Sequence, residues 1–146
     1  MTVTLGQAIR NAAEVERAGA RFYAMLAERT TNEAARAFFE KLAGDEVVHA
    51  EELERQGAEL GDQYAAALPE ACVKMIESAP GWEQAEEITP EQAFQIALEA
   101  ENHAALYYDS LADFAEGEVR EFFLRLAKME ESHAEVLRSR RDELFG

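Results

Sequence analysis

Phe38-Phe-Glu-Lys-Leu-Ala-Gly-Asp-Glu-Val-Val-His49 returns, 84 residues later, as Phe122-Phe-Leu-Arg-Leu-Ala-Lys-Met-Glu-Glu-Ser-His133. Each stretch has aromatic and leucine side chains three or four residues apart, the spacing that puts them on one face of an α-helix. Each also ends in a glutamate followed three residues later by a histidine, and both polar residues fall on the apolar face. The two stretches therefore predict similar helices, each with polar groups in the middle of its buried face.

A second match extends this repeat to the segments that precede the two stretches, with a shift of 85 residues. The two halves of the chain are thus predicted to be copies of one helical hairpin. The matched pairs are Glu14 with Glu99, Glu16 with Glu101, Tyr23 with Tyr108, and Leu26 with Leu111.

The sequence predicts an all-α fold, a ferritin-like four-helix bundle made of two antiparallel hairpins joined by a long crossover. The joints within each hairpin are only a few residues long, so each helix folds back on its predecessor. The middle joint, residues 61–89, is long enough to run the length of the bundle, and its apolar runs 65–68 and 73–76 are expected to form a short helix. The four long helices are predicted at residues 5–29, 32–59, 90–114 and 117–143.

Two helix starts carry capping signals. Residues 89–92, Thr-Pro-Glu-Gln, combine a capping hydroxyl, a proline at the first helical position and a glutamine three residues after the cap. Thr30 and Glu33 predict a similar capping box before the second helix.

Length and composition limit the classes of protein to which the chain can belong. Its 146 residues, 48% of them hydrophobic, predict a single globular domain spanning residues 1–146. The 30 acidic residues outnumber the 14 basic ones, and a net charge of −16 repels nucleic acids and anionic membranes. No apolar run approaches the ~18 residues of a membrane span. The single cysteine, Cys72, forms no internal disulfide, so we expect a cytoplasmic protein.

Polar residues interrupt the inward faces of all four predicted helices. Tracing each helix in alternating steps of four and three residues gives an apolar face, except near its middle. Burying an unpaired carboxylate is unfavourable by several kcal/mol, and four carboxylates in one layer repel each other. The interrupting residues are Glu16, Glu46, His49, Glu101, Glu130 and His133.

Two bound cations would remove this conflict. Glutamate and histidine three residues apart lie on one helical face, carboxylates can bridge two ions, and each imidazole can bind one. Two Glu-x-x-His segments with a lone glutamate from each of two other helices form the ligand set of di-iron and di-manganese bundle proteins. We therefore predict that the six residues bind two metal ions. The alternatives are a buried polar network, or inward helix faces that have been assigned wrongly by one position.

Tyr23 and Tyr108 lie two turns beyond the lone glutamates Glu16 and Glu101. At that position a hydroxyl can donate a hydrogen bond across the bundle to a carboxylate ligand, which would give both tyrosines a supporting role at the site. Ordinary core packing is the alternative. Glu14, Glu99 and His103 lie off the inward faces and are expected at the surface.

At these residues the chain resembles the rubrerythrin branch of the ferritin-like superfamily, over nearly its whole length. The resemblance implies a non-haem centre of two iron ions that reacts with oxygen or hydrogen peroxide. It further implies that Glu16 and Glu101 are terminal ligands, that Glu46 and Glu130 bridge, and that His49 and His133 bind one ion each. The matching motifs are Glu16-x6-Tyr23, Glu46-Val-Val-His49, Glu101-x6-Tyr108 and Glu130-Glu-Ser-His133.

Two departures from this family shape the expectation. Full rubrerythrins carry a rubredoxin domain with paired CxxC motifs, whereas this sequence has one cysteine. Turnover is therefore expected to need either an external electron donor or the release of ferric iron. Typical rubrerythrins also have a further glutamate three residues after the third-helix ligand, where this chain has Ala104. The six-ligand set is closer to the symmetrical centres of bacterioferritins.

We expect a di-iron oxidoreductase or iron-handling protein in which peroxide or oxygen oxidises two Fe(II) ions together, and we expect it to form a homodimer. The alternative is a non-catalytic bundle that binds zinc or manganese for structure, or an interaction scaffold, because glutamate and histidine accept several first-row metals. Hydroxylation of an organic substrate would need a roomy pocket beside the metals, and nothing in the sequence marks one.

Overall fold

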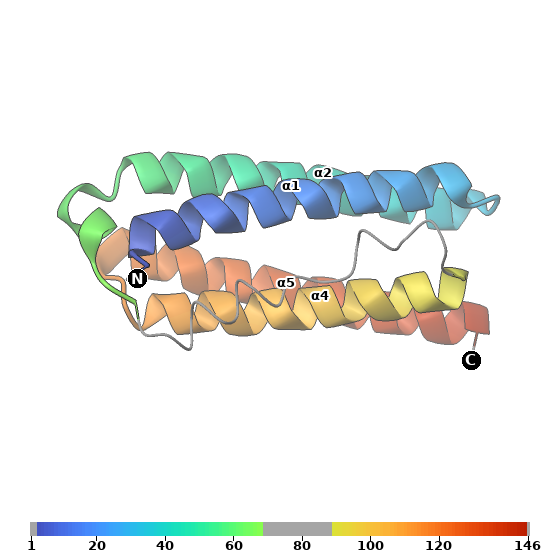
Figure 1. The fold of residues 1–146 in the computed structure, drawn as a ribbon. Coiled ribbons are helices and arrows are strands. Elements are labelled where there is room, and N and C mark those ends of the chain that lie inside the picture. The colour runs from blue at the N-terminus through green and yellow to red at the C-terminus, as the bar shows by residue number, and fades with distance from the viewer. Residues whose placement is uncertain (1–2, 69–88, 146) are drawn as a thin grey trace.

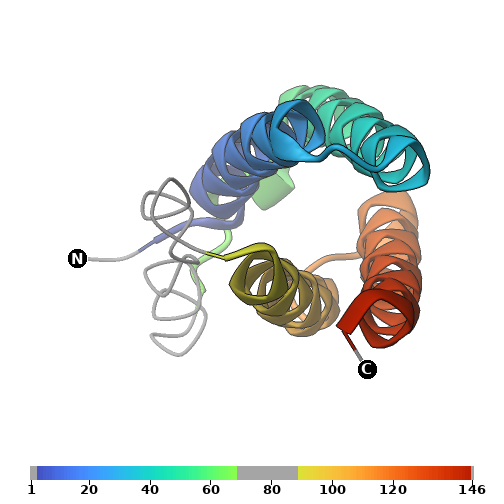
Figure 2. The same ribbon diagram turned by 90° about the vertical axis from the view of Figure 1, so that its right-hand side faces the viewer.

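The computed structural model describes residues 3–68 and 89–145, and these form two helical hairpins laid against each other (Figure 1). Viewed along the axis of the bundle, the long helices lie at its corners and surround a common core (Figure 2). The most extensive packing is within each hairpin, α1 with α2 and α4 with α5. The predicted four-helix bundle is confirmed. Its elements are α1 (Leu5–Arg29), α2 (Glu33–Ala58), the 3-10 helix η1 (Gly61–Ala65), α4 (Pro90–Ala112) and α5 (Gly117–Phe145).

The helix starts are set by capping side chains. Thr89 forms the predicted capping box with Gln92: its hydroxyl accepts from the Gln92 N–H at 3.2 Å, and the Gln92 side chain accepts from the Thr89 N–H at 2.8 Å. The predicted box of Thr30 and Glu33 is wrong. Asn32 caps α2 instead, by accepting from the Ala35 N–H at 3.0 Å, because its amide stands directly before the first helical residue.

The crossover joins opposite ends of the bundle, since α2 ends where α1 begins and α4 starts at the far end (Figure 1). The short helix predicted at 65–68 is wrong, because η1 ends at Ala65, Ala66 is extended and Ala67 forms an isolated antiparallel bridge with Thr4. Backbone groups of residues 66–68 pair with the start of α1, where the Leu5 N–H donates to the Ala66 carbonyl at 2.8 Å and the Leu68 N–H to the Val3 carbonyl at 2.9 Å. The run 73–76 lies outside the described residues.

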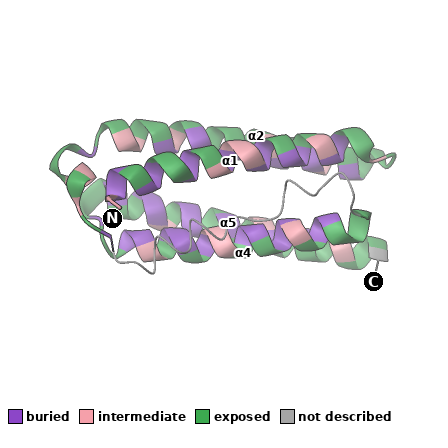
Figure 3. Cartoon of the chain, in the orientation of Figure 1, coloured by how far each residue is buried: buried purple, intermediate pink, exposed green. Residues whose placement is uncertain are grey.

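Two apolar clusters fill the bundle, one toward each end, and buried residues line the inward faces of the helices (Figure 3). One cluster is centred on Ile9, Leu111 and Phe123. The other is centred on Phe39, Phe94 and Leu137. The residues between the two clusters are the polar ones, so the fold places them in the middle of its core.

Candidate metal centre

Each of the four helices contributes to one buried polar layer. Glu16 comes from α1, Glu46 and His49 from α2, Glu101 from α4, and Glu130 and His133 from α5. Five of these residues are almost completely buried. The His133 side chain is the most exposed of the six, with 12% of its surface accessible. Helical spacing brings together all six residues singled out from the sequence.

The six side chains form two overlapping groups that could each hold a metal ion. One group consists of Glu16, Glu46, His49 and Glu130, and the other of Glu46, Glu101, Glu130 and His133. Within each group, one ligand atom of every residue lies within 4.8 Å of those of the other three. Glu46 and Glu130 belong to both groups, and the remaining ligands of each group come from a single hairpin.

Within the described residues, six buried polar atoms of this layer lack hydrogen-bond partners. In each group such atoms belong to carboxylates and to a histidine ring, so lone pairs converge without enough protons to share. Buried polar groups in folded proteins are nearly always hydrogen-bonded, and a cluster of exceptions indicates a bound ion or water. The buried atoms without a partner are Glu46 Oε1, His49 Nδ1 and Nε2, Glu101 Oε2, Glu130 Oε1 and His133 Nδ1.

Both histidines direct Nδ1 toward the carboxylates. His49 Nδ1 lies 3.1 Å from Glu130 Oε1 and 3.9 Å from Glu16 Oε2. His133 Nδ1 lies 3.6 Å from both Glu46 Oε1 and Glu101 Oε2. The two rings stack at a centroid distance of 5.8 Å. The chemistry of this donor set suits a pair of divalent first-row ions, because imidazole and carboxylate are both ligands of such metals.

Two tyrosines hold the lone glutamates from the opposite hairpin. The Tyr23 hydroxyl donates to Glu101 Oε1 at 2.6 Å, and the Tyr108 hydroxyl donates to Glu16 Oε1 at 2.5 Å. Burial, and then the charge of Glu101, raises the pKa of Tyr23 well above its usual value. Burial, and then the charge of Glu16, does the same to the pKa of Tyr108. Both phenols therefore stay protonated as donors, and each orients one carboxylate.

The pKa values of two buried carboxylates, Glu130 and Glu101, shift in opposite directions. Burial, reinforced by the charges of Glu16 and Glu101, raises the pKa of Glu130 well above that of an ordinary glutamate. Burial also acts to raise the pKa of Glu101, but interactions with Glu130, His133 and Tyr23 outweigh it, and the pKa is lowered. In the absence of a metal, Glu130 thus binds a proton more tightly than Glu101 does.

One further contact reaches the cluster from outside. His133 Nε2 lies 3.2 Å from Oδ2 of Asp45, a partly exposed residue of α2. Sequence reasoning missed Asp45 because it stands beside the inward face rather than on it. The internal repeat could have drawn attention to Asp45, because it corresponds to Met129 and so departs from the repeat, whereas its neighbour Glu46 corresponds to Glu130 and keeps it.

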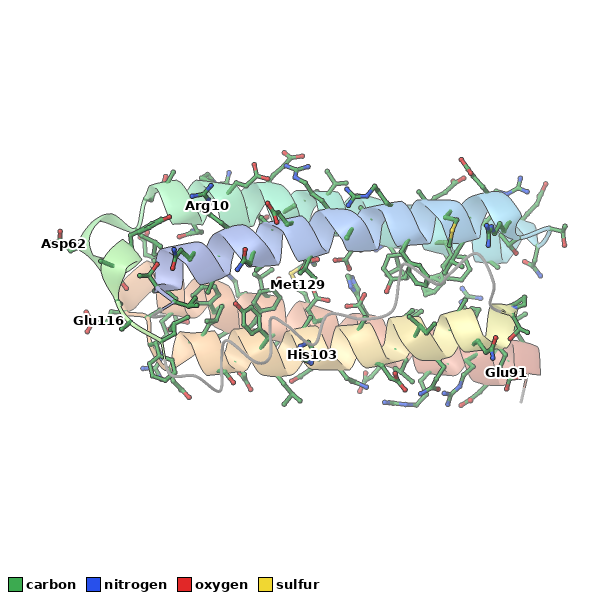
Figure 4. The ribbon with its side chains drawn as sticks, viewed as in Figure 1. Arg10, Asp62, Glu91, His103, Glu116 and Met129 are labelled. Atoms are coloured by element: carbon green, nitrogen blue, oxygen red, sulfur yellow. The ribbon has the colours of Figure 1, made fainter. Side chains whose placement is uncertain are left out.

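The remaining polar candidates lie outside both groups. Glu14 and Glu99 are exposed, as expected. His103, labelled in Figure 4, is half-buried on α4 rather than fully exposed, and it is not a member of either group.

Comparison with known proteins supports the sequence resemblance. The family model described as Rubrerythrin matches residues 1–57 and 92–146, a range that contains all six residues of the polar layer. No curated protein and no solved structure gave a match. Within the described residues, no helix combines the length and apolarity needed to cross a membrane.

Proposed function

The chain belongs to the rubrerythrin family, and on that premise we propose that it is a non-haem di-iron protein that oxidises Fe(II), or reduces hydrogen peroxide or oxygen, at one dinuclear centre. When bound, a pair of Fe(II) ions would supply two electrons, one from each ion, enough with two protons to reduce one hydrogen peroxide to two waters. The proposed ligands are Glu16, Glu46, His49, Glu101, Glu130 and His133.

One observation carries this proposal: buried acceptor atoms without hydrogen-bond partners converge in two groups that share Glu46 and Glu130. A structural polar network would pair donors with acceptors, because an unmet buried polar group is unfavourable by about 1–3 kcal/mol. Two cations would satisfy all of these atoms except His49 Nε2. The sharing of two carboxylates favours bridging roles for Glu46 and Glu130, with Glu16 and Glu101 each serving one ion.

The chain's own contribution is orientation and exclusion of water. Apolar clusters lie on both sides of the layer, so solvent has little access except beside His133. Tyr23 and Tyr108 fix the carboxylates of Glu101 and Glu16 from across the bundle. Supporting contacts of this kind set the orientation of metal ligands and tune the bound ion. Because each tyrosine reaches the other hairpin, ligand orientation also depends on correct docking of the two hairpins.

The electrons for repeated turnover have two proposed sources. Further Fe(II) could replace oxidised iron released from the centre, in which case Fe(II) is the substrate and the protein handles iron. An external electron donor could reduce the centre in place, in which case peroxide or oxygen is the substrate. Both routes use the same ligands, and the ratio of iron released to oxidant consumed distinguishes them.

Oxidation of anaerobically loaded protein tests the proposal. We expect wild-type protein loaded with Fe(II) to develop near-ultraviolet and visible absorption rapidly when peroxide or oxygen is added. Glu46→Gln removes a charge that both groups share and should abolish rapid oxidation. Glu14→Gln removes the same charge from an exposed position of α1 and should leave it unchanged.

Two outcomes would contradict the proposal. One is equal oxidation rates in wild type and Glu46→Gln. The other is stoichiometric zinc or manganese in protein purified without added metal, combined with no uptake of Fe(II), which would indicate a structural metal bundle. Because glutamate and histidine do not select among these metals, this comparison has to be made on the protein itself.

A further inference from the structure

The two histidines of the polar layer differ in the contacts of Nε2, the ring nitrogen other than the one that faces the carboxylates. His133 Nε2 lies 3.2 Å from Asp45 Oδ2. His49 Nε2 is buried and has no hydrogen-bond partner among residues 3–68 and 89–145. The two-fold repeat predicts equal surroundings for the two rings, so this contact breaks the symmetry of the centre.

The asymmetry originates in one position of the repeat. Asp45 on α2 corresponds to Met129 on α5, with the same shift of 84 residues that relates His49 to His133. Met129, labelled in Figure 4, offers a thioether, which accepts hydrogen bonds only weakly. Met129 is also 42% exposed, so the α5 position tolerates a polar side chain.

Hydrogen-bond chemistry makes this difference matter for metal binding. A carboxylate only accepts, so contact with Asp45 places the proton of a neutral His133 ring on Nε2 and leaves the lone pair on Nδ1. That lone pair faces Glu46 and Glu101. For His49 to present Nδ1 in the same way, its proton must sit on Nε2, where the described part of the chain provides no acceptor.

We propose that Asp45 is a positioning residue for His133 and that it makes the two ion positions unequal. The position formed by Glu46, Glu101, Glu130 and His133 binds a divalent ion more tightly than the position that contains His49. A partner that orients a metal-bound histidine is typically worth 10–100-fold in affinity, which sets the expected difference. This inference rests on the proposed two-metal centre and goes beyond it by ordering the filling of its positions.

An anaerobic titration with Co(II), followed by calorimetry and visible absorption, tests the inference without any turnover. Wild-type protein should bind two ions in steps that differ about 10–100-fold in affinity. Glu101→Gln and Glu16→Gln each alter a ligand that belongs to one group alone, so they assign the two steps. The amide oxygen of either glutamine still accepts from the tyrosine hydroxyl, which keeps that contact in place.

Substitutions at the asymmetric position separate positioning from simple charge. Asp45→Ala should weaken the tighter step about 10–100-fold and leave the weaker one nearly unchanged. Asp45→Asn should retain part of the affinity, because its amide oxygen can accept from Nε2. Met129→Asp should strengthen the weaker step by supplying the acceptor that His49 lacks, a gain that damage to the fold cannot mimic.

Two control variants complete the test. Glu51→Ala removes an equal charge from an exposed position of α2 and should leave the ratio of the two steps unchanged. Lys41→Met removes the ion pair that Lys41 Nζ makes with Asp45 Oδ2 at 3.1 Å, and should also preserve the ratio.

Each outcome has a distinct meaning. Equal steps in wild type, or equal weakening of both steps by Asp45→Ala, would overturn the inference and leave the two-ion centre standing. Failure of wild-type protein to bind any ion would overturn the proposed function together with the inference.

Discussion

Tyr23 offers a quantitative test of how the two hairpins are held together. Its hydroxyl donates a buried 2.6 Å hydrogen bond to Glu101, whose lowered pKa keeps it ionised at neutral pH. Tyr23→Phe removes this bond but keeps the aromatic ring, which packs 5.7 Å from Phe22 and 6.4 Å from Phe39 between centroids. A hydrogen bond to a charged group contributes about 1.5–3 kcal/mol, so the metal-free variant should lose that much free energy of unfolding.

Thermal and urea unfolding of metal-free protein measure this loss. For a chain of this size, 1 kcal/mol shifts the unfolding temperature by about 2–4 °C, so Tyr23→Phe should lower it by about 3–12 °C. Tyr107→Phe is the matched control, because its buried hydroxyl donates at 3.3 Å to a neutral acceptor, the Ala8 carbonyl. That bond should contribute only about 0.5–1.5 kcal/mol.

A double-mutant cycle identifies the partner. Combining Tyr23→Phe with Glu101→Leu, whose side chain offers no acceptor, should give a coupling free energy of at least about 0.5 kcal/mol, as expected for residues in direct contact. Additive losses, or a loss no larger than that of Tyr107→Phe, would refute the idea that a charged hydrogen bond ties α1 to α4 at this layer.

Three further predictions concern pH, metal and packing. Metal-free protein should lose stability as the pH rises from about 4.5, because the raised pKa of Glu130 means that the folded state binds more protons than the unfolded state above that pH. Urea midpoints should therefore fall with pH in wild type and much less in Glu130→Gln. A flat wild-type profile would contradict this. Each divalent ion held at 100 times its dissociation constant should add about 2.7 kcal/mol of stability, so calorimetric unfolding that is unchanged by Zn(II) or Mn(II) would argue against a folded-state site. Gly6→Ala should lower the free energy of unfolding by about 1–3 kcal/mol, because a Cβ there meets the Tyr64 ring. Gly44→Ala, on open helix surface, should raise it by about 1 kcal/mol. Equal effects in denaturant unfolding would refute the packing argument.

Helical periodicity explains why so much of the bundle was predictable. A residue such as Glu46 is placed by its neighbours Leu42 and His49, and a 3.6-residue period leaves little freedom in which face is buried. Four helices have to bring their polar interruptions to one level. The internal repeat favours this, because Glu16 and Glu46 are 30 residues apart in one hairpin and Glu101 and Glu130 are 29 apart in the other. Local sequence patterns of this kind therefore predict the buried helix faces correctly.

The features that sequence reasoning missed depend on contacts between distant segments. Residues 66–68 pair with Val3 and Leu5, a contact that no local pattern specifies. Asp45 contacts His133 on another helix. Its neighbour in the sequence, Glu46, lies on the inward face and was predicted correctly, but helical periodicity does not place Asp45 there. The cap of α2 is a choice between neighbouring candidates, Thr30 and Asn32, which differ only slightly in preference.

The position of bound iron tests the central claim most directly. Crystals of protein loaded anaerobically with Fe(II) should show two anomalous scattering peaks per chain at the iron absorption edge, one in each ligand group, with Glu46 and Glu130 lying between them. A single peak, or peaks confined to the acidic surface, would contradict a dinuclear centre in the core of this bundle.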